Sequence, residues 1–578
     1  MKVAYIILCI SFCLAFDLSF HGQEGKIAPS SDIEKLAEPI IAVAAQRPLP
    51  PHLFQIWTVA SNETRMNENI TVDELTVERD ASLTLMNCTL MINSNDGTTG
   101  EIAIQGELIL RGGTIIKAVN PGYRYNFHFW TTSIFNGSDS TIRDVGNLIE
   151  SPFPIVQSDR GIQLKSEKTI LKNMTISHCL DGLAVFTNNP VQIDHCKIVD
   201  NIFAGVRVQP GFGNVVINNS LLEGNGIGFL ADEEIQTKRG SNNTIQNCTI
   251  NANTEYGIGI LSGDNNTILR NHIANHSVGI YIEKSMDTKL ERNVIEQCSI
   301  GIILEHGSSG NLLQQNNIRL GDIGISLASS GPNILLRNKI SDTQEAALSI
   351  DRCIRGDSIS SNNLRSSSGF AIRVTKSKLV YIDNNSILGV SEADPAVYIE
   401  ESESCFITKN AISARLQAIH LQDSSNNIFS QNIPSALTKT FLLADGTSFN
   451  TTLTIFDRAN RTSLLPGATL RLIPDADSAS EVTSMTLLVD KRTFATSDAS
   501  NYELEIDTVT LGGGNFTVTV EIMFKNGTTS SWVFLLEIKG RPRDPGTTSG
   551  TNGNMLLPLV LGMLLLGRLR SKDTQKKI

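Results

Sequence analysis

Three residues able to bind a sugar recur about one repeat apart in this sequence. Arg373, Tyr398 and His420 are separated by 25 and 22 residues. Each is the third residue of a four-residue pattern that opens with Ala and is apolar at its second and fourth places: Ala371-Ile-Arg-Val, Ala396-Val-Tyr-Ile and Ala418-Ile-His-Leu. A guanidinium donates hydrogen bonds to hydroxyls or carboxylates, and aromatic rings cover apolar sugar faces. If the fold brings these residues into one column, they predict a shallow glycan-binding strip.

A second group of aromatic residues lies in the segment 117–135, which interrupts the repeat rhythm. It contains Tyr123, Tyr125 and Trp130. Insertions in repeat proteins often lie on the working face. The sequence therefore predicts that this insertion lies on the working face and offers these three residues as a second candidate ligand-binding set.

Cysteine and histidine residues raise the question of a metal. Seven cysteines follow the N-terminal apolar run, at positions 88, 179, 196, 248, 298, 353 and 405. An odd number argues against a complete disulfide framework, and we expect buried free thiols. The adjacent pairs His178-Cys179 and His195-Cys196 contain soft ligands suited to copper or zinc. Since Cys196 is expected to point inward, we predict no metal site and no cofactor.

These side chains are positioned by a repeat that runs from about Gly182 to Ile433. A four-residue pattern opening with Gly or Ala recurs roughly every 22 residues, a period typical of solenoids. Its apolar residues alternate with other residues, as in strands. The third residue of each pattern then points outward, because its two neighbours point inward.

A second motif, Asn-x-Ile or Asn-x-Leu, runs in phase with the first. It occurs at Asn219, Asn271, Asn293, Asn316, Asn338, Asn362, Asn385 and Asn410. Strands stacked about 4.8 Å apart would place these amides above one another at an inward corner, where they can bond as a ladder. Together the two motifs predict an all-β chain, with a right-handed parallel β-helix over residues 54–440.

The pairing of Asn-x-Ile with Gly-Ile-x-Leu resembles the parallel β-helix repeat family. That family includes pectate lyases, polygalacturonases, alginate epimerases and the periplasmic, copper-associated NosD-like proteins. The resemblance implies the fold, whereas it says little about activity, because the repeated residues are those that build the coil. The chain has no Met-rich or His-rich tract, so the NosD-like resemblance does not carry a copper site here.

Fragments of enzyme motifs are incomplete. The run Ile193-Asp194-His195 resembles part of a pectate lyase motif, but Gln192 stands where that motif has Trp. Asp181-Gly182 resembles one Asp-Gly site of polygalacturonases, whose chemistry needs paired carboxylates, and the other motifs of those enzymes are missing. The sequence favours a protein without catalysis and leaves open a lyase, hydrolase or epimerase.

The two ends of the chain carry apolar segments. Lys2 precedes an apolar run of signal-peptide length, so we expect a signal peptide over 1–22 and a linker or N-terminal cap over 23–53. Residues 541–554 read as a flexible linker, and 555–578 as a hydrophobic anchor or sorting signal with a basic tail. These segments predict a protein that is extracellular, on the cell surface and attached to membrane or wall.

Residues 450–540 lack the repeat and contain separate strand patterns. Asn526-Gly527 between two of them is a strong hairpin signal. We expect a small antiparallel β-sandwich similar to immunoglobulin-like modules, which would act as a spacer or cap.

Composition limits the range of partners. The formal net charge is −11, and outside the basic tail the sequence has no basic cluster of the kind that binds nucleic acid through phosphate contacts. The partners that we predict are a polysaccharide or cell-envelope glycan, and a membrane through the C-terminal segment. The leading prediction is a cell-surface β-helix protein that binds carbohydrate or serves as an adhesin or envelope spacer. A NosD-like metal-handling protein is the weaker alternative.

Overall fold

The structure of the chain is a computed structural model. It describes residues 55–94, 100–146, 160–232, 241–415 and parts of 417–538. The signal peptide, the 23–53 segment, the 541–554 linker and the C-terminal anchor of the sequence analysis lie outside the described residues. Within these ranges the chain forms strands and turns and no helix, and no segment is a helix long and apolar enough to cross a bilayer.

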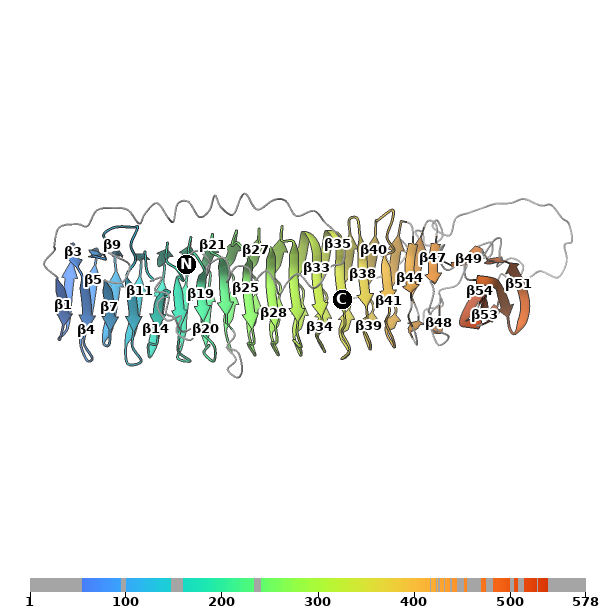
Figure 1. Cartoon of the computed structure of the whole chain (residues 1–578), viewed down its shortest axis with the longest axis horizontal. Helices are drawn as coiled ribbons and strands as arrows, with labels where there is room; N and C mark the ends of the chain where they lie inside the picture. Colours follow the sequence, from blue (N-terminus) through green and yellow to red (C-terminus); the bar gives the residue numbers. More distant parts are fainter. Residues whose placement is uncertain are drawn as a thin grey trace, which may run out of the picture. The chain divides into compact units, whose positions relative to one another are not determined.

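The main body is a parallel β-helix made of three sheets, which confirms the fold predicted from the repeat. Each coil contributes one strand to each sheet, and each strand pairs in parallel with its counterpart one coil later. The strands consequently lie side by side along the stack from β1 to β48 (Figure 1). We name the three sheets in the order in which a coil visits them.

Sheet 1 contains β1 (Ile56–Val59), β4 (Glu74–Val77), β7 (Glu101–Ile104), β10 (Asn126–Phe129), β13 (Ile162–Leu164), β16 (Leu183–Val185), β19 (Ala204–Val208), β22 (Ile227–Ala231), β25 (Tyr256–Leu261), β28 (Val278–Glu283), β31 (Ile300–Glu305), the later parts of β33 (Asn317–Ala328) and β35 (Lys339–Asp351), β38 (Phe370–Thr375), β41 (Val397–Glu400), β44 (Gln417–Gln422) and β47 (Lys439–Leu443).

Sheet 2 contains β2 (Glu63–Met66), β5 (Ser82–Met86), β8 (Glu107–Arg111), β11 (Ile134–Ser138), β14 (Lys168–Lys172), β17 (Val191–Asp194), β20 (Val215–Asn218), β23 (Thr244–Gln246), β26 (Thr267–Leu269), β29 (Lys289–Glu291), β32 (Leu312–Gln314), β34 (Ile334–Leu336), β36 (Ser358–Ser360), β39 (Tyr381–Asp383), β42 (Phe406–Thr408), β45 (Ile428–Ser430) and β48 (Thr452–Thr454).

Sheet 3 contains β3 (Asn69–Val72), β6 (Thr89–Ile92), β9 (Ile115–Ala118), β12 (Thr141–Arg143), β15 (Thr175–Ser177), β18 (Lys197–Val199), β21 (Leu221–Glu223), β24 (Thr249–Asn251), β27 (His272–Ala274), β30 (Val294–Glu296), the first parts of β33 and β35, β37 (Asn363–Ser366), β40 (Ser386–Gly389), β43 (Ala411–Ala414) and β46 (Ile433–Ala436).

The core is built from columns of apolar side chains that repeat from coil to coil. Ile258, Ile280, Ile302 and Ile325 pair in register on sheet 1 and are fully buried. The glycine that opens each pattern has a packing role, since a Cβ at Gly279 would lie 2.6 Å from the carbonyl oxygen of Gly301. A close backbone approach of this kind favours glycine.

The predicted asparagine ladder is present at the corner between sheets 2 and 3. Buried amides from Asn271 to Asn432 bond coil to coil, for example from Asn293 Nδ2 to Asn316 Oδ1 at 3.0 Å. Asn219, assigned to this ladder from sequence, is outside it. The buried Ser220 takes the ladder position, and its Oγ accepts from the Cys196 backbone N–H at 3.0 Å. Asn219 is instead the corner residue just before Ser220, where it has a positive φ of 48°.

Two further ladders were not predicted. One lies at the corner before sheet 2, where Asn311 Nδ2 donates to Asn333 Oδ1 at 3.0 Å. The other lies at the corner before sheet 1, where Asn225 Nδ2 donates to Asn253 Oδ1 at 2.9 Å. Polar ladders therefore satisfy buried groups at all three corners, alongside backbone bonds between successive coils such as that from the Gln315 N–H to the Leu336 carbonyl.

The aromatic segment 117–135, interpreted from the sequence as an insertion, is part of the regular coil, so that interpretation was wrong. It supplies β10 and the start of β11, and Phe127, Phe129 and Phe135 fill the core. The rings of Phe129 and Phe135 stack with centroids 4.4 Å apart. Aromatic residues replace the usual Ile and Val columns here, which explains why the repeat was not recognised in this coil.

The C-terminal residues form a small antiparallel sheet, as predicted in outline. Strand β50 (Val482–Val489) pairs with β51 (Arg492–Asp498) and β53 (Gly514–Phe524), β53 pairs with β54 (Thr529–Ile538), and β49 (Thr469–Pro474) pairs with β52 (Leu504–Asp507). Gly527 lies between β53 and β54 with a φ of 80°, as the hairpin signal predicts. The immunoglobulin-like classification and the domain limits remain predictions.

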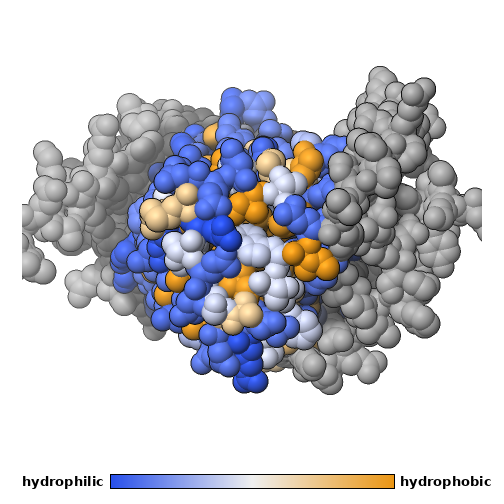
Figure 2. Space-filling view, turned by 90° about the vertical axis from the view of Figure 1, so that its left-hand side faces the viewer, coloured by the Kyte–Doolittle hydropathy of each residue, from blue (hydrophilic) through white to orange (hydrophobic). Residues whose placement is uncertain are grey.

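The first coil leaves an end of the β-helix partly apolar. Within the described residues β1 pairs only with β4. Trp57 and Ile70 are partly buried against the core, and Ile56 is 58% exposed. Figure 2 shows apolar residues near the centre of this end, with hydrophilic residues around them. An unpaired strand edge of this kind is a place where another chain could add.

Candidate functional site

The outer face of sheet 1 carries the predicted column. Arg373, Tyr398 and His420 lie in register on consecutive strands β38, β41 and β44. All three side chains are half-buried and point away from the core, as the alternation requires. Ser349 and Ser326 precede them in the same column, so the surface beside Arg373 is flat.

Tyr398 contacts Phe370 and His420, and Arg373 contacts Phe370. The Tyr398 ring lies 5.3 Å from the Phe370 ring and 5.1 Å from the His420 ring, which it meets edge-on. The Arg373 guanidinium lies 5.7 Å from the centre of the Phe370 ring. The Tyr398 hydroxyl donates to Gln422 Oε1 at 2.9 Å. The sequence analysis missed Phe370, although it directly precedes the Ala of the repeated pattern.

The second predicted set is divided by the fold. Tyr125 is 1% exposed and belongs to the core, so it cannot contact an external ligand. Tyr123 is half-buried in the turn before β10, and Trp130 is 51% exposed after it. Tyr125 therefore leaves the candidate set, while Tyr123 and Trp130 stay predictions.

Sheet 2 carries an aromatic pair that the sequence analysis did not single out. Tyr381 and Phe406 stack with ring centroids 4.9 Å apart and planes inclined by 7°. One face of each ring covers the other, and Tyr381 stays 41% exposed. A shallow cavity of about 270 Å³ also lies on this sheet, lined in part by Glu167, Lys168 and Gln192.

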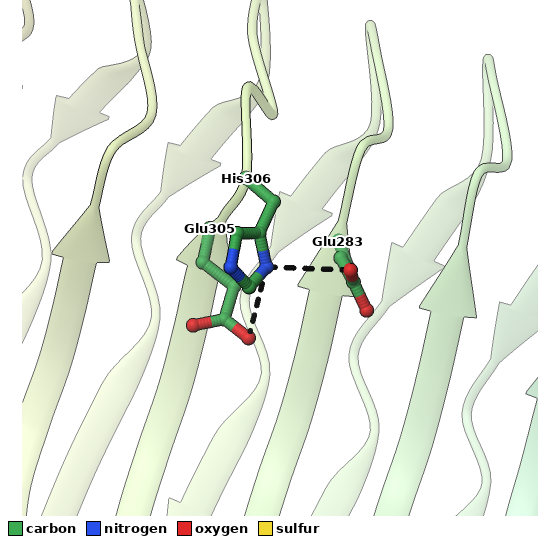
Figure 3. A group of neighbouring side chains, drawn as sticks. All are labelled: Glu283, Glu305 and His306. Carbon is green, nitrogen blue, oxygen red and sulfur yellow. Dashed lines mark ion pairs between the residues drawn. The ribbon is translucent and has the colours of Figure 1, made fainter. Parts of the chain in front are cut away.

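A cluster of polar groups lies on sheet 1 where β28 and β31 end. Glu283 and Glu305 are in register on these strands, and His306 follows at the corner (Figure 3). His306 Nδ1 lies 3.3 Å from Glu283 Oε1 and 3.5 Å from Glu305 Oε1. The Tyr281 hydroxyl bonds to both carboxylates. Burial and then the bond to Glu305 raise the pKa of Tyr281 well above its ordinary range, so the phenol stays a donor.

The residues of the enzyme-like fragments do not meet. Asp181 is fully buried before β16 on sheet 1, where its Oδ1 accepts from the Ala204 backbone N–H at 3.0 Å. His195 follows β17 on sheet 2, with a side chain 64% exposed and paired with Asp194 at 3.0 Å. The two fragments thus serve separate sheets and form no common acid–base site.

The seven cysteines within the described residues are buried and free, as predicted. Burial raises the pKa of Cys179 to about 12 and that of Cys196 to about 11. Their partner histidines, His178 and His195, have positive φ values at corners and point away from the buried thiols. The His-Cys pairs consequently form no joint ligand set.

A family model described as periplasmic copper-binding protein (NosD) matches residues 138–319, and one described as right handed beta helix region matches residues 352–458. No curated protein sequence matches the chain.

Solved structures with a similar fold are distant. DFA-IIIase from Arthrobacter chlorophenolicus A6, in complex with DFA-III, is 13% identical with a TM-score of 0.34, over 48% of this chain and 83% of its own. The Dettilon tailspike protein is 11% identical with a TM-score of 0.33, over 68% and 72%. The periplasmic alginate epimerase AlgG is 11% identical with a TM-score of 0.29, over 63% and 84%. Such low scores carry no conclusion about what this chain binds or catalyses.

The copper named by one family model can be tested against the described residues. Thiolate ligands are not offered, because the cysteines point into the core. Among the described residues, Glu283, Glu305 and His306 are the one group of three whose ligand atoms all lie within 4.8 Å of one another, and carboxylate with imidazole suits divalent copper. The three stacked parallel sheets and the two family-model matches together identify this chain as a right-handed parallel β-helix repeat protein.

Proposed function

We propose that this protein binds an extended polysaccharide along the outer face of sheet 1, without chemical conversion of the sugar. The strip consists of Arg373, Tyr398, His420 and Phe370. The observation that carries the proposal is the alignment of a cation, a phenol and an imidazole on consecutive strands, each half-exposed and facing outward.

The spacing of the strip suits an extended sugar chain. Strands repeat about every 4.8 Å, close to the rise of one sugar residue, so successive residues of the protein can meet successive sugars. Aromatic side chains cover apolar sugar faces, and the guanidinium and hydroxyl groups donate to sugar oxygens. Arg373 Nε is buried and has no hydrogen-bond partner among the described residues, whereas the side chain as a whole is 38% exposed, so a ligand would be met by the outer part of the guanidinium.

Charge around the strip favours a neutral polysaccharide. Arg373 Nη1 lies 3.9 Å from Glu345 Oε1, and Asp351 and Glu400 occupy the adjacent outward row of sheet 1. The formal net charge of the chain is −11. A strongly anionic glycan would meet repulsion from these carboxylates.

We place the protein outside the cytoplasm. The periplasmic description of the matching family model and the apolar run near the N-terminus support this location. The same proposal includes attachment to a membrane or cell wall through residues 555–578. It also includes a spacer role for the C-terminal sheet and an adhesin or envelope role for the whole protein.

The test is a glycan array probed with wild-type protein and with the triple variant Arg373→Ser, Tyr398→Ser, His420→Ser. We expect the wild type to retain neutral polysaccharides and the triple variant to lose that retention. The matched control is the double variant Tyr381→Ser, Phe406→Ser, which removes the aromatic pair of sheet 2. Far-UV circular dichroism verifies that each variant keeps its strands.

Two outcomes would redirect the proposal. If retention survives the triple variant and is lost in the sheet 2 control, the binding face is sheet 2. If the wild type releases new reducing or unsaturated ends from a retained glycan, the protein is a hydrolase or lyase, and the non-enzymatic proposal fails.

A further inference from the structure

A set of nitrogen and oxygen donors lies on the outer edge of sheet 1, several coils from the glycan strip. Glu283 and Glu305 are the last residues of β28 and β31, and His306 follows Glu305 at the corner. A φ of 51° at His306 folds the chain back, so that the imidazole lies beside both carboxylates (Figure 3). The set is therefore assembled by one corner and two neighbouring strands.

The distances from the imidazole to the two carboxylates match the separation expected between two ligands of one metal ion. His306 Nδ1 lies 3.3 Å from Glu283 Oε1 and 3.5 Å from Glu305 Oε1. A charge-assisted hydrogen bond is shorter, about 2.7–2.9 Å. Two donors bonded to one ion at about 2.0–2.1 Å in a tetrahedral arrangement lie roughly 3.3 Å apart. We propose that Glu283, Glu305 and His306 form a binding site for a divalent transition-metal ion.

A further residue orients the ligands. The Tyr281 hydroxyl donates to Glu283 Oε2 at 3.2 Å, which leaves Glu283 Oε1 directed at the imidazole. The same hydroxyl also lies within hydrogen-bonding distance of Glu305 Oε1, the oxygen that faces His306, so its single proton is shared between the two carboxylates. Hydrogen bonds from groups behind the ligands fix the orientation of metal-binding side chains and raise affinity, and Tyr281 has that position here.

Charge balance also favours a cation at this place. Two carboxylates one coil apart repel each other. Lys284 supplies the nearest positive charge, with its Nζ 3.2 Å from Glu283 Oε1 and a side chain 46% exposed. A bound divalent ion would replace this ammonium at the carboxylate oxygen. Lys284 therefore acts as a competitor that keeps the site compact until metal binds.

The donor set selects a class of metal. An imidazole with two carboxylates suits Cu²⁺ and Zn²⁺, whereas Ca²⁺ and Mg²⁺ take oxygen ligands. A Cβ placed on Gly307, the residue after His306, would have no atom within 4 Å. The corner is thus open on that side, where a water molecule can complete the coordination.

The experiment is titration of the full-length protein with Zn²⁺ and with Cu²⁺ by isothermal calorimetry, with Ca²⁺ as the comparison ion. We expect one site that binds Cu²⁺ and Zn²⁺ and does not bind Ca²⁺. Glu283→Gln, Glu305→Gln and His306→Asn should each weaken binding at least tenfold, and Tyr281→Phe about tenfold. Lys284→Met should tighten binding.

The matched control is His272→Asn. The imidazole of His272 also pairs with a glutamate, at 2.8 Å from Glu296 Oε1, but Arg319 bonds to that carboxylate and no second acid joins the pair. This variant should bind metal as the wild type does. In the Cu²⁺ protein, electron paramagnetic resonance should show coupling to one imidazole nitrogen, which His306→Asn removes and His272→Asn retains.

Three results would overturn the site. The first is that the wild type binds neither Cu²⁺ nor Zn²⁺. The second is that the three ligand variants bind the metal as tightly as the wild type does. The third is that His272→Asn loses the imidazole coupling of the bound Cu²⁺. A ligand variant that does not fold leaves the proposal testable, because Lys284→Met keeps all three ligands and must tighten binding. Metal binding and glycan retention use different residues, so either can fail without the other.

Discussion

The side-chain amide of Asn316 donates to Oδ1 of Asn338, one coil farther along the chain, at 3.0 Å. The backbone N–H of Asn316 donates to the same oxygen, and its second amide hydrogen is taken by the Leu290 carbonyl at 3.0 Å. In turn, Asn316 Oδ1 accepts both the backbone and the side-chain N–H of Asn293. Each asparagine thus satisfies buried groups of three coils.

Replacing Asn316 by Leu should destabilise the β-helix. The change removes the acceptor of two buried donors on Asn293 and the side-chain donor to Asn338 Oδ1 and the Leu290 carbonyl, while the backbone N–H of residue 316 still reaches Asn338. Unsatisfied buried groups cost about 1–3 kcal/mol each in unfolding free energy. Urea denaturation of Asn316→Leu should show this loss, whereas Asn363→Leu, at an exposed position beside the ladder, should change stability little. Equal midpoints for Asn316→Leu and the wild type would argue against a structural ladder.

The ladder shows how far a sequence pattern can be taken. Alternation and period predict which residues are inward, so the coil and the Asn271–Asn410 ladder followed from the sequence. Asn219 and Ser220 are adjacent polar residues, and the pattern alone could not decide which of them occupies the inward ladder position. The second ladder was also visible, as Asn-x-Ile at Asn266 and Asn-x-Leu at Asn311, but it requires knowing that a coil has a polar corner before sheet 2.

The candidate site was predicted in part for a similar reason. The column of Arg373, Tyr398 and His420 depends only on strand register, which the repeat fixes. The group of Glu283, Glu305 and His306 depends on the corner after the strand, where a left-handed residue turns the imidazole back over the preceding coil. Sequence spacing does not reveal that reversal. The pair of glutamates at equal places in successive repeats was the available signal.

Asp357 replaces an asparagine in the second ladder and should make stability depend on pH. Its Oδ1 accepts from Asn333 Nδ2 at 3.2 Å, while its buried Oδ2 has no hydrogen-bond partner in the part of the chain that the structure describes. Burial raises the pKa of Asp357 from 3.8 to about 6. Because the folded pKa is raised, the protonated acid stabilises the fold fully below about pH 4 and this contribution is lost as the pH rises through 6.

The variant Asp357→Asn should remove that dependence. An amide at this position can donate to a backbone carbonyl, as Asn333 Nδ2 does to Ser308 at 3.2 Å. At pH 7.5 we expect the variant to be more stable than wild type by about 1–3 kcal/mol, and the difference should shrink at pH 4.5. Melting temperatures of both proteins at the two pH values test this, and an equal difference at both would contradict it.

The buried thiols should be inert in the native protein. Burial raises the pKa of Cys248 and of Cys405 to about 11, and thiolate is the reactive form. An aromatic disulfide reagent at pH 8 should modify none of the seven cysteines in the described residues until a denaturant is added. Mass spectrometry of the labelled peptides identifies the sites. Rapid labelling of native Cys248 would show that the coil opens there.

Removal of residues 555–578 should release the protein from the cell. The segment combines an apolar run with a basic tail, and the proposal assigns it anchoring or sorting. Fractionation of cells that express the truncated chain should find it in the medium, with the full-length chain in the membrane or wall fraction. A truncated chain that stays with the membrane would remove the anchor from the proposal.

Arg207 should be required for stability because it compensates a buried acid. Its Nε donates to Asp232 Oδ2 at 2.9 Å, and its Nη1 lies 3.6 Å from Oδ2 of the fully buried Asp181. Burial raises the pKa of Asp181, and the guanidinium opposes that rise. Arg207→Met leaves this carboxylate buried without its nearest cation, and loss of one partner of a buried pair costs about 3–5 kcal/mol.

The partner change Asp181→Asn distinguishes charge compensation from simple packing. Asparagine keeps the acceptor for the Ala204 backbone N–H and removes the charge, so this variant alone should lose less stability than Arg207→Met. If the role of Arg207 is electrostatic, Asp181→Asn should rescue part of the Arg207→Met loss, with a coupling free energy of at least about 1 kcal/mol in a double-mutant cycle. Urea denaturation of the four proteins gives that value. Strictly additive losses would mean that Arg207 stabilises the coil through packing over sheet 1 and that Asp181 tolerates burial without it.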